Sequence, residues 1–340
     1  MKKFPGSLPA ATAGRVVTWS PSVTLVPTHS CFNACGYCSF RHPPDPADPL
    51  RDALDPAVAR QRLLGRPRAT EVLLLSGEVA PASRHRRRWF RRLVGLSRLA
   101  LELGRLPHTN AGPLSMAEMA ALGRLNPSMG LMLEGLGPAY AALHRHAPSK
   151  SPERRLAQLE QAGRLGIPFT SGLLLGVGET MDDRRRGLEL LAALQGRWGH
   201  LQEVILQPWR PDGAVATPLP ARERQDLLGT IRLARAILPA EVHLQLPPNL
   251  WPIRDLPEAL EAGIDDLGGI DTTDVINPAY TQPRPERLGR ALAAAGWTLR
   301  PRLCVHAAWL RWLPPDLRRR AAALQERLLA SHPPDPRSAP

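Results

Sequence analysis

The sequence has few of the features that mark membrane, secreted or nucleic-acid-binding proteins. None of its 340 residues belongs to an apolar run approaching the roughly 20 residues that a membrane-spanning helix needs, so no membrane contact is expected. No apolar segment follows Lys2 and Lys3, so we expect no signal peptide and a cytoplasmic location. Aromatic residues make up 5% of the chain and lie mostly outside its arginine-rich segments, which disfavours base stacking and therefore a nucleic-acid partner.

The net charge of +13 also has an explanation that needs no nucleic acid. Much of the excess is arginine on predicted helical surfaces, as in the segment 84–92. A basic surface of this kind would also suit an acidic electron-donor protein.

Cysteine is scarce, and three of the four cysteines lie within eight residues. Cys31, Cys35 and Cys38 are spaced C-x3-C-x2-C, and such crowding in a chain without a secretion signal favours a metal site over disulfides. Three thiolates can ligate three irons of a cubane 4Fe–4S cluster and leave the fourth iron open. Zinc is the structural alternative, with His29 or His42 completing its four ligands, as in a zinc-stabilised basic protein that binds RNA.

Short apolar runs alternate with amphipathic segments along most of the chain. The predicted strands are 23–26, 71–75, 105–108, 128–133, 169–175, 203–207, 242–246 and 264–270. The predicted helices are 55–64, 83–103, 115–124, 151–165, 181–197, 221–237, 255–262 and 284–295, with Ser115 and Ser151 as N-caps. The pattern predicts an α/β fold with a parallel sheet, closed as a (β/α)8 TIM-type barrel.

The ends of the chain stand outside this alternation. We expect an N-terminal lead at 1–20, the barrel at 21–296 and a partly flexible C-terminal extension at 297–340. Cys304, alone in that extension, is predicted to be a small buried hydrophobe.

Most of the distinctive polar residues follow a predicted strand. Working sites of such barrels lie beyond the C-terminal ends of the strands, so this distribution predicts one active site on that rim. The candidates are Cys31, Cys35, Cys38, Gly77, Glu78, His108, Asn110, Glu134, Gly176, Glu179, Gln207, Asn249, Asp271 and Thr272.

The cysteine spacing, on a loop after the first strand, resembles that of radical S-adenosylmethionine (SAM) enzymes. The resemblance implies one 4Fe–4S cluster held by Cys31, Cys35 and Cys38. It also implies that SAM binds the open iron, and that a reductant such as ferredoxin or flavodoxin supplies the electron that cleaves SAM to a 5′-deoxyadenosyl radical.

The resemblance extends to residues expected to bind SAM. The segment 76–78 resembles the element that binds the methionyl ammonium, which implies roles for Gly77 and Glu78. The segment 172–179, with Gly176 and Glu179, resembles the element that lies along the adenine. Tyr37 matches the position that contacts adenine, and Glu134 is a candidate for the ribose hydroxyls.

Longer blocks resemble the CofG family, the 7,8-didemethyl-8-hydroxy-5-deazariboflavin (FO) synthase subunit that works with CofH. These blocks are 106–110, 128–134, 162–170, 199–207, 245–250 and 265–270. The resemblance implies that CofH supplies an adduct of tyrosine-derived carbon and a ribityl-aminouracil. The radical then abstracts hydrogen from this adduct, the ring closes, and ammonia leaves to give FO.

Polar side chains at the strand ends are candidates for contacts with the uracil or the ribityl hydroxyls, with loop or capping hydrogen bonds as the alternative. The candidates are His108, Asn110, Gln207, Asn249, Asp271 and Thr272. CofH itself and an aminofutalosine-type enzyme are the alternatives within the same chemistry, and the blocks at 107–110 and 247–249 favour CofG over both. The resemblance ends near residue 297, where the segment 302–306 departs from the expected pattern.

Overall fold

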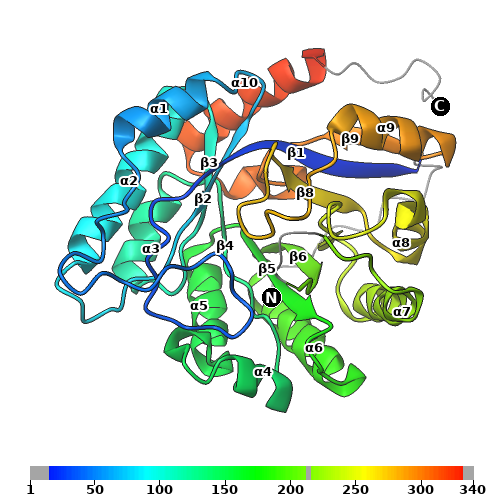
Figure 1. Cartoon of the computed structure of the whole chain (residues 1–340). Helices are drawn as coiled ribbons and strands as arrows, with labels where there is room; N and C mark the ends of the chain where they lie inside the picture. The colour runs from blue at the N-terminus through cyan, green and yellow to red at the C-terminus, as the bar shows by residue number, and fades with distance from the viewer. Residues whose placement is uncertain (1–14, 212–215, 332–340) are drawn as a thin grey trace.

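The fold is a closed parallel barrel, described here from a computed structural model for residues 15–211 and 216–331 (Figure 1). The strands that close the barrel are β1 (Val16–Leu25), β2 (Glu71–Leu75), β3 (Leu106–Asn110), β4 (Ser128–Gly130), β5 (Phe169–Leu175), β6 (Leu201–Pro208), β7 (His243–Gln245) and β8 (Asp266–Ile270). They pair in sequence order, and β1 pairs with both β2 and β8 to close the sheet. The predicted (β/α)8 fold is therefore confirmed.

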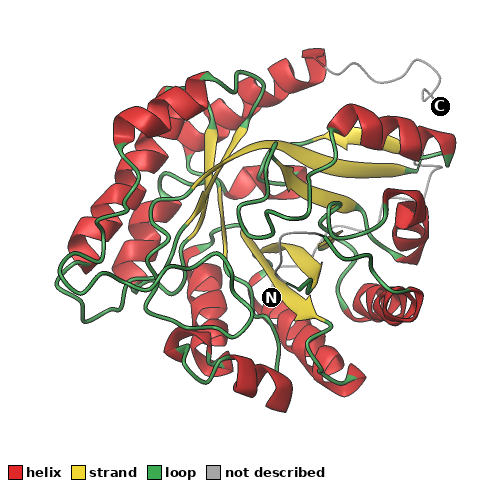
Figure 2. Ribbon diagram, in the orientation of Figure 1, coloured by secondary structure: helices red, strands yellow, loops and turns green. Residues whose placement is uncertain are grey.

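Helices surround the barrel, as Figure 2 shows. The eight predicted helices are α1 (Pro56–Leu64), α2 (Arg86–Glu102), α3 (Met116–Gly123), α5 (Pro152–Leu165), α6 (Met181–Trp198), α7 (Ala221–Ile237), α8 (Leu256–Ala262) and α9 (Pro285–Ala294). Two further helices are α4 (Pro138–Leu143) and α10 (Pro315–Ser331), and short 3-10 turns cover Pro148–Lys150, Ile253–Asp255 and Ala307–Trp312. No helix in the described part of the chain is long and apolar enough to cross a membrane.

The predicted helix caps at Ser115 and Ser151 are confirmed. The Ser115 hydroxyl accepts from the Glu118 backbone N–H at 3.3 Å, and the Glu118 carboxylate accepts from the Ser115 N–H at 2.8 Å. Ser151 accepts from the Arg154 N–H at 3.4 Å. Each cap satisfies a donor that the first turn of a helix would otherwise leave unpaired, so these helices begin where the sequence indicates.

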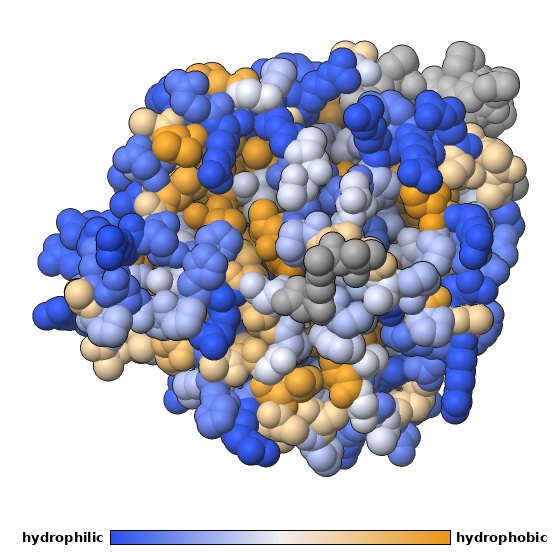
Figure 3. All heavy atoms as spheres, viewed as in Figure 1, coloured by the Kyte–Doolittle hydropathy of each residue, from blue (hydrophilic) through white to orange (hydrophobic). Residues whose placement is uncertain are grey.

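Helix α2 shows how the arginine-rich segment folds. Trp89, Leu93, Leu96 and Ala100 form its buried stripe, and most of its arginines face outward, where hydrophilic residues gather in Figure 3. Arg86 is an exception, because it forms two hydrogen bonds to Glu118 and packs against the Trp89 ring.

Strands from the expected N-terminal lead and the expected C-terminal extension contribute to the sheet. Strand β1 begins at Val16, within the expected lead, and its first half pairs with β9 (Thr298–Pro301), which lies in the expected C-terminal extension. Helix α10 follows and packs its buried face against Leu106 and Leu303. Cys304 belongs to the same apolar cluster with 3% of its surface exposed, as predicted.

Candidate active site

The cysteine loop lies over the C-terminal rim of the barrel. Backbone hydrogen bonds hold it: Phe32 N–H to the Glu78 carbonyl at 3.0 Å, Ala34 N–H to the His146 carbonyl at 2.7 Å and Gly36 N–H to the Leu143 carbonyl at 2.8 Å. These contacts tie the loop to the end of β2 and to the segment around α4. The loop is thereby fixed on two sides.

Cys31, Cys35 and Cys38 all line one cavity beneath this loop, which we call the cluster cavity. Burial raises the pKa of Cys35 to about 11, with Lys150 opposing the shift. Burial and the Glu78 charge also raise the pKa of Cys31. The Cys31 and Cys35 thiols are therefore protonated at neutral pH until a bound metal displaces their protons.

The zinc alternative finds no support in this geometry. His29 and His42 stack on each other at 4.9 Å, and neither lines the cluster cavity. The His29 Nδ1–H donates to the Phe40 carbonyl at 3.0 Å. Cys304 lies at the opposite end of the barrel, so within the described residues the cluster cavity offers three cysteine ligands.

Glu134 lies at the end of β4 in a strained conformation. It is the non-glycine residue with positive φ, 69°, in the described chain. Its N–H donates to the Gly172 carbonyl at 2.9 Å, and its carbonyl accepts from the Leu174 N–H at 2.8 Å. These bonds to β5 keep the strained backbone in place and aim the side chain into the cluster cavity.

The Glu134 carboxylate is the centre of a charged network. It accepts from the Tyr37 hydroxyl, from His144 Nε2 at 2.9 Å and from the Lys150 ammonium. These partners, Lys150 above all, lower the pKa of Glu134 despite its burial. Burial and the neighbouring Glu134 charge raise the pKa of Tyr37. Tyr37 is therefore protonated and Glu134 ionised at neutral pH.

Glu78 and Gly77 follow β2 at the wall of the same cavity. Glu78 accepts from Asn33 at 2.9 Å and from Arg155 at 3.0 Å in a buried ion pair. Gly77 must be glycine, because a Cβ there would lie 2.2 Å from the Ser30 carbonyl oxygen. The end of β2 therefore packs directly under the cysteine loop.

Gly176 and Glu179 lie outside the lining of the cluster cavity. The Glu179 carboxylate accepts from the Gly176 and Val177 N–H groups, each at 2.8 Å, and pairs with Arg184 at 2.8 Å. Glu179 thus shapes the turn after β5. Leu174, in β5 just before that turn, does line the cluster cavity.

A second cavity, which we call the interior cavity, continues from the rim into the barrel. His108, Asn110, Gln207, Asn249 and Asp271, all predicted to bind substrate, line it. The two cavities share wall residues, among them Leu75, Asn110, Met132 and Gln207. A ligand in one cavity would therefore adjoin a ligand in the other.

Thr272 does not line the interior cavity. It is exposed, and its hydroxyl accepts a hydrogen bond from Arg66. Asp271 does reach the cavity, but its carboxylate also accepts from the Thr24 N–H at 2.7 Å and pairs with Arg66 at 3.3 Å. The structure thus places Thr272 on the outer side of this loop.

Sequence reasoning missed four residues of the cluster cavity or its network: Asn33, His144, Lys150 and Arg155. Asn33 lies inside the cysteine motif, and its Nδ2 contacts Cys31 Sγ at 3.7 Å. The other three come from the irregular segment after β4 and the start of α5, where no strand end marks them. The sequence feature that could have indicated these three residues is a cluster of basic residues after Glu134, which is less specific than a motif.

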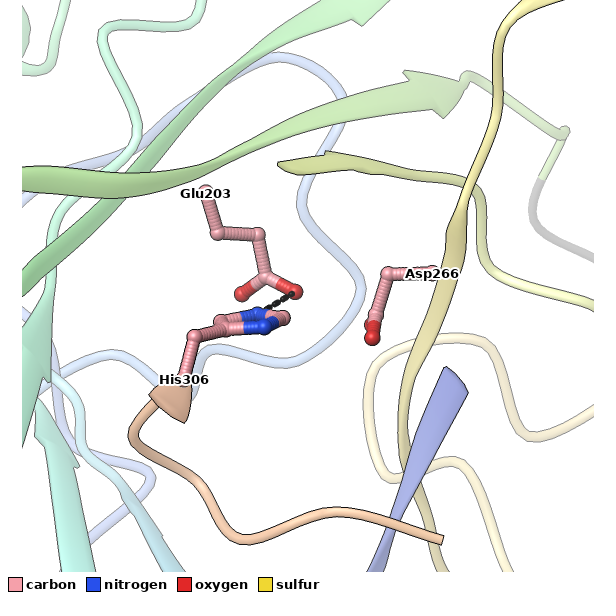
Figure 4. Close-up of side chains that lie close together, drawn as sticks. All are labelled: Glu203, Asp266 and His306. Atoms are coloured by element: carbon pink, nitrogen blue, oxygen red, sulfur yellow. Dashed lines mark ion pairs between the residues drawn. The ribbon is translucent and has the colours of Figure 1, made fainter. Parts of the chain in front are cut away.

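The lower end of the interior cavity contains charged residues. Glu203, Asp266 and His306 offer ligand atoms within 4.8 Å of one another, and Figure 4 shows how these side chains converge. Arg302, however, donates to Glu203 at 2.6 Å and to Asp266 at 2.6 Å. The Arg302 guanidinium already occupies oxygens of both carboxylates, so this cluster is an internal ion-pair network.

Comparison with known proteins identifies the family. Residues 25–191 match the family model described as the radical SAM superfamily. The chain is 51% identical over 321 residues to a protein of Gloeobacter violaceus named 7,8-didemethyl-8-hydroxy-5-deazariboflavin synthase, covering 94% of this chain and 96% of that protein. Proteins of the same name from Synechococcus elongatus and Synechocystis sp. are 50% and 48% identical, covering 91% and 89% of this chain and 92% and 97% of theirs. The chain belongs to this family of radical SAM enzymes.

Two solved structures share the fold. The FeFe-hydrogenase maturase HydG from Carboxydothermus hydrogenoformans superposes with a TM-score of 0.63 at 18% identity, covering 94% of this chain and 79% of that one. Methylornithine synthase (PylB) gives a TM-score of 0.61 at 17% identity, covering 84% and 83%. At these identities the likeness concerns the barrel alone.

Radical SAM enzymes use a 4Fe–4S cluster, SAM and a reductant. The cluster cavity fits the cluster and SAM, because it is lined by three cysteine sulfurs and by polar side chains, among them Tyr37, Glu78, Glu134 and Lys150. Such a mixture of carboxylates and cations can hold both charged groups of an amino acid.

Proposed function

We propose that this enzyme carries out the CofG reaction. In it, the adduct 5-amino-5-(4-hydroxybenzyl)-6-(D-ribitylimino)uracil becomes FO with loss of ammonia, while SAM becomes methionine and 5′-deoxyadenosine. The observation that carries the proposal is the 51% sequence identity, over 94% of the chain, to a relative named for this product. The adjoining cluster and interior cavities give the two reactants neighbouring places.

The three cysteines and the side chains around them form the radical-generating half of the site. When held by Cys31, Cys35 and Cys38, one reduced 4Fe–4S cluster supplies the electron that cleaves SAM to the hydrogen-abstracting radical. Glu78 presents a carboxylate to the methionyl ammonium, and Lys150 presents a cation to the methionyl carboxylate. Tyr37 and Glu134 lie where they would contact the adenosine.

Gly176 and Glu179 take a supporting role in this proposal. Glu179 fixes the backbone N–H groups of the turn after β5, which follows directly on Leu174 in the wall of the cluster cavity. In this proposal the backbone of this turn approaches the adenine ring, and Glu179 keeps the turn in shape without contacting SAM itself.

The walls of the interior cavity suit a substrate with N–H donors. Asn249 Oδ1 and Gln282 Oε1 are buried at this cavity and accept no hydrogen bond from the described residues. Buried acceptors without donors are costly, so a ligand that donates to them gains affinity. The pyrimidine of the proposed adduct carries such donors, and Asn110 and Gln207 at the shared wall would face its reacting end.

Residues in this cavity also support CofG over CofH. The blocks that favour CofG are 107–110 and 247–249, and both contribute side chains to the interior cavity, namely His108, Asn110 and Asn249. A CofH or aminofutalosine-type enzyme remains the alternative, and it would act on a different substrate. We further propose that CofH delivers the adduct, that ferredoxin or flavodoxin is the reductant, and that the enzyme acts in the cytoplasm.

The reaction can be tested with purified protein. After anaerobic reconstitution with iron and sulfide, the reduced protein is incubated with SAM and the adduct, and 5′-deoxyadenosine and FO are measured by chromatography and fluorescence. Both products should form. Deoxyadenosine without FO would refute the substrate, and neither product together with stoichiometric zinc would refute the chemistry.

A pair of cysteine variants tests the cluster ligands. Cys35→Ala should lose the iron–sulfur absorbance and both products. Cys304→Ser should retain iron, because Cys304 lies in the apolar cluster behind the far end of the barrel. Loss of iron in both variants would show that the readout reports folding and not ligation.

A further inference from the structure

The interior cavity reaches far below the rim. Glu71, Leu73 and Leu75 alternate along β2, and all three line the cavity. At about 3.3 Å per residue, Glu71 lies about 13 Å along the strand from Leu75 at the shared wall. Most barrel interiors of this class are filled by layers of apolar side chains, so a cavity of this depth is space for a ligand.

Polar residues line the lower end of the cavity, and we call four of them the cavity floor: Glu71, His108, Glu203 and Arg302. All are buried or nearly so, with Glu71 5% exposed and His108 8% exposed. The floor is too far from the cysteine loop to take part in hydrogen abstraction. Its groups can only contact a part of the ligand remote from the reacting atoms.

Hydrogen bonds fix the tautomer of His108. The Ser128 hydroxyl donates its proton to the Cys304 carbonyl at 2.8 Å, because a carbonyl can only accept. The same hydroxyl lies 2.7 Å from His108 Nδ1 and must therefore accept the Nδ1–H of His108. Burial and the Arg302 charge lower the pKa of His108 to about 3, so the ring is neutral. Its Nε2 lone pair remains as a fixed acceptor beside Gly130 on the cavity wall.

The charges of the cavity floor exclude most charged ligands. Arg302 pairs with Glu203 and Asp266, and none of the ion pairs in the described part of the chain includes Glu71. An anion would meet the carboxyl groups of Glu71 and Glu203, and a cation would meet Arg302. A neutral group with several hydroxyls avoids both penalties, since each hydroxyl donates to one acceptor and accepts from another donor.

Building on the proposed function, we propose that the cavity floor binds the hydroxyl-bearing chain of the substrate. His108 Nε2 and the Glu71 carboxyl receive hydroxyl donors, and the reacting rings are thereby directed up toward the cysteine loop. The C-terminal segment has a defined role in this arrangement: the Arg302 charge adds to the burial that lowers the pKa of His108, and the Cys304 carbonyl sets the His108 tautomer through Ser128.

Two ligands that differ only in this chain provide the test. FO and its analogue with a methyl group in place of the ribityl chain are titrated into the anaerobically reconstituted enzyme, with deazaflavin fluorescence as the readout. FO should bind at least about 10-fold more tightly than the methyl analogue, which is the effect expected of one or two net hydrogen bonds. Equal affinities would overturn the inference and leave the cavity floor as an ion-pair network that only supports the fold.

The variant His108→Leu should lose most of the preference for FO while its affinity for the methyl analogue is unchanged. That unchanged affinity also shows that the variant is folded; should it not fold, the ligand pair on the unaltered enzyme decides alone. The matched control is His85→Leu, because His85 precedes α2 and lines neither cavity. A preference retained in His108→Leu would refute the role of His108.

Failure of the proposed function gives a different result. The same preparation is assayed for FO formation from the adduct. Formation of FO with equal affinities refutes the cavity floor alone. A 10-fold preference in protein that forms deoxyadenosine but no FO supports the cavity floor and refutes the proposed reaction.

Discussion

Removing the Arg302 guanidinium should destabilise the barrel strongly. Arg302 is 10% exposed and hydrogen-bonds to Glu203 and Asp266, which are 5% and 0% exposed. In Arg302→Met, two buried carboxylates lose their cation. Breaking a buried pair from one side costs about 3–5 kcal/mol, because the remaining charge keeps its desolvation penalty.

This cost translates into a measurable shift. An unfolding entropy of about 2.1 cal/mol/K per residue gives about 0.7 kcal/mol/K for a chain of 340 residues. A loss of about 3–5 kcal/mol therefore lowers the unfolding midpoint by about 4–7 °C. Anaerobic thermal and urea unfolding, followed by circular dichroism, would measure both quantities.

A surface pair provides the matched control for this substitution. Arg254 is 87% exposed and lies 3.6 Å from Asp255, so Arg254→Met should cost about 0–1 kcal/mol. Adding Glu203→Gln and Asp266→Asn to Arg302→Met should recover stability, because the uncharged amides need no cation. A loss below about 1 kcal/mol in Arg302→Met, or no recovery in the triple variant, would refute the reasoning.

Two further predictions concern the two cavities. Gly112→Ala should weaken SAM binding and reduce deoxyadenosine formation without loss of iron, because φ is +76° and the new Cβ would lie 2.3 Å from the Glu78 carboxyl carbon; Gly95→Ala, on an open helical surface, is the control. Burial raises the pKa of Glu71 from 4.5 to about 7, so the folded state holds a proton that the unfolded chain releases, and stability falls as pH rises through that window. The free energy of unfolding of Glu71→Gln should therefore rise by up to about 3 kcal/mol relative to that of the parent between pH 5 and pH 8. Urea unfolding of both proteins at the two pH values would measure this. The same difference between variant and parent at both pH values would contradict the prediction.

Local rules predicted much of the fold and of the cluster cavity. The C-x3-C-x2-C spacing placed three ligands on one loop, and Ser115 with Glu118 marked the start of α3, because both features depend on neighbours a few residues apart. The strand ends brought Glu78 and Glu134 to one rim, because parallel strands share their direction. In each case the prediction used either residues a few positions apart or the common direction of the parallel strands.

Contacts between residues far apart in the sequence could not be predicted in this way. Arg155 pairs with Glu78 across 77 positions, and Lys150 is the last residue of a short 3-10 turn that has no periodic pattern. Strand β9 has four residues, and its place beside β1 depends on a pairing across most of the chain. No local propensity distinguishes such a segment from a loop, so the C-terminal extension and Arg302 could not be assigned to the barrel.

One signal of the deep cavity was nevertheless present in the predicted strands. The sequence prediction ended the third strand at His108, but β3 continues to Asn110, which moves His108 from the rim into the barrel. Glu71 and Glu203 likewise occupy inward strand positions where a filled barrel would carry aliphatic residues. Burying such groups without partners costs several kcal/mol, so they persist only where an ion pair, a hydrogen bond or a ligand satisfies them. Arg302 pairs with Glu203, whereas Glu71 forms no ion pair within the described residues and has the Ser20 hydroxyl and the Arg302 charge as its neighbours; its carboxyl group lines the cavity, where a ligand hydroxyl can reach it.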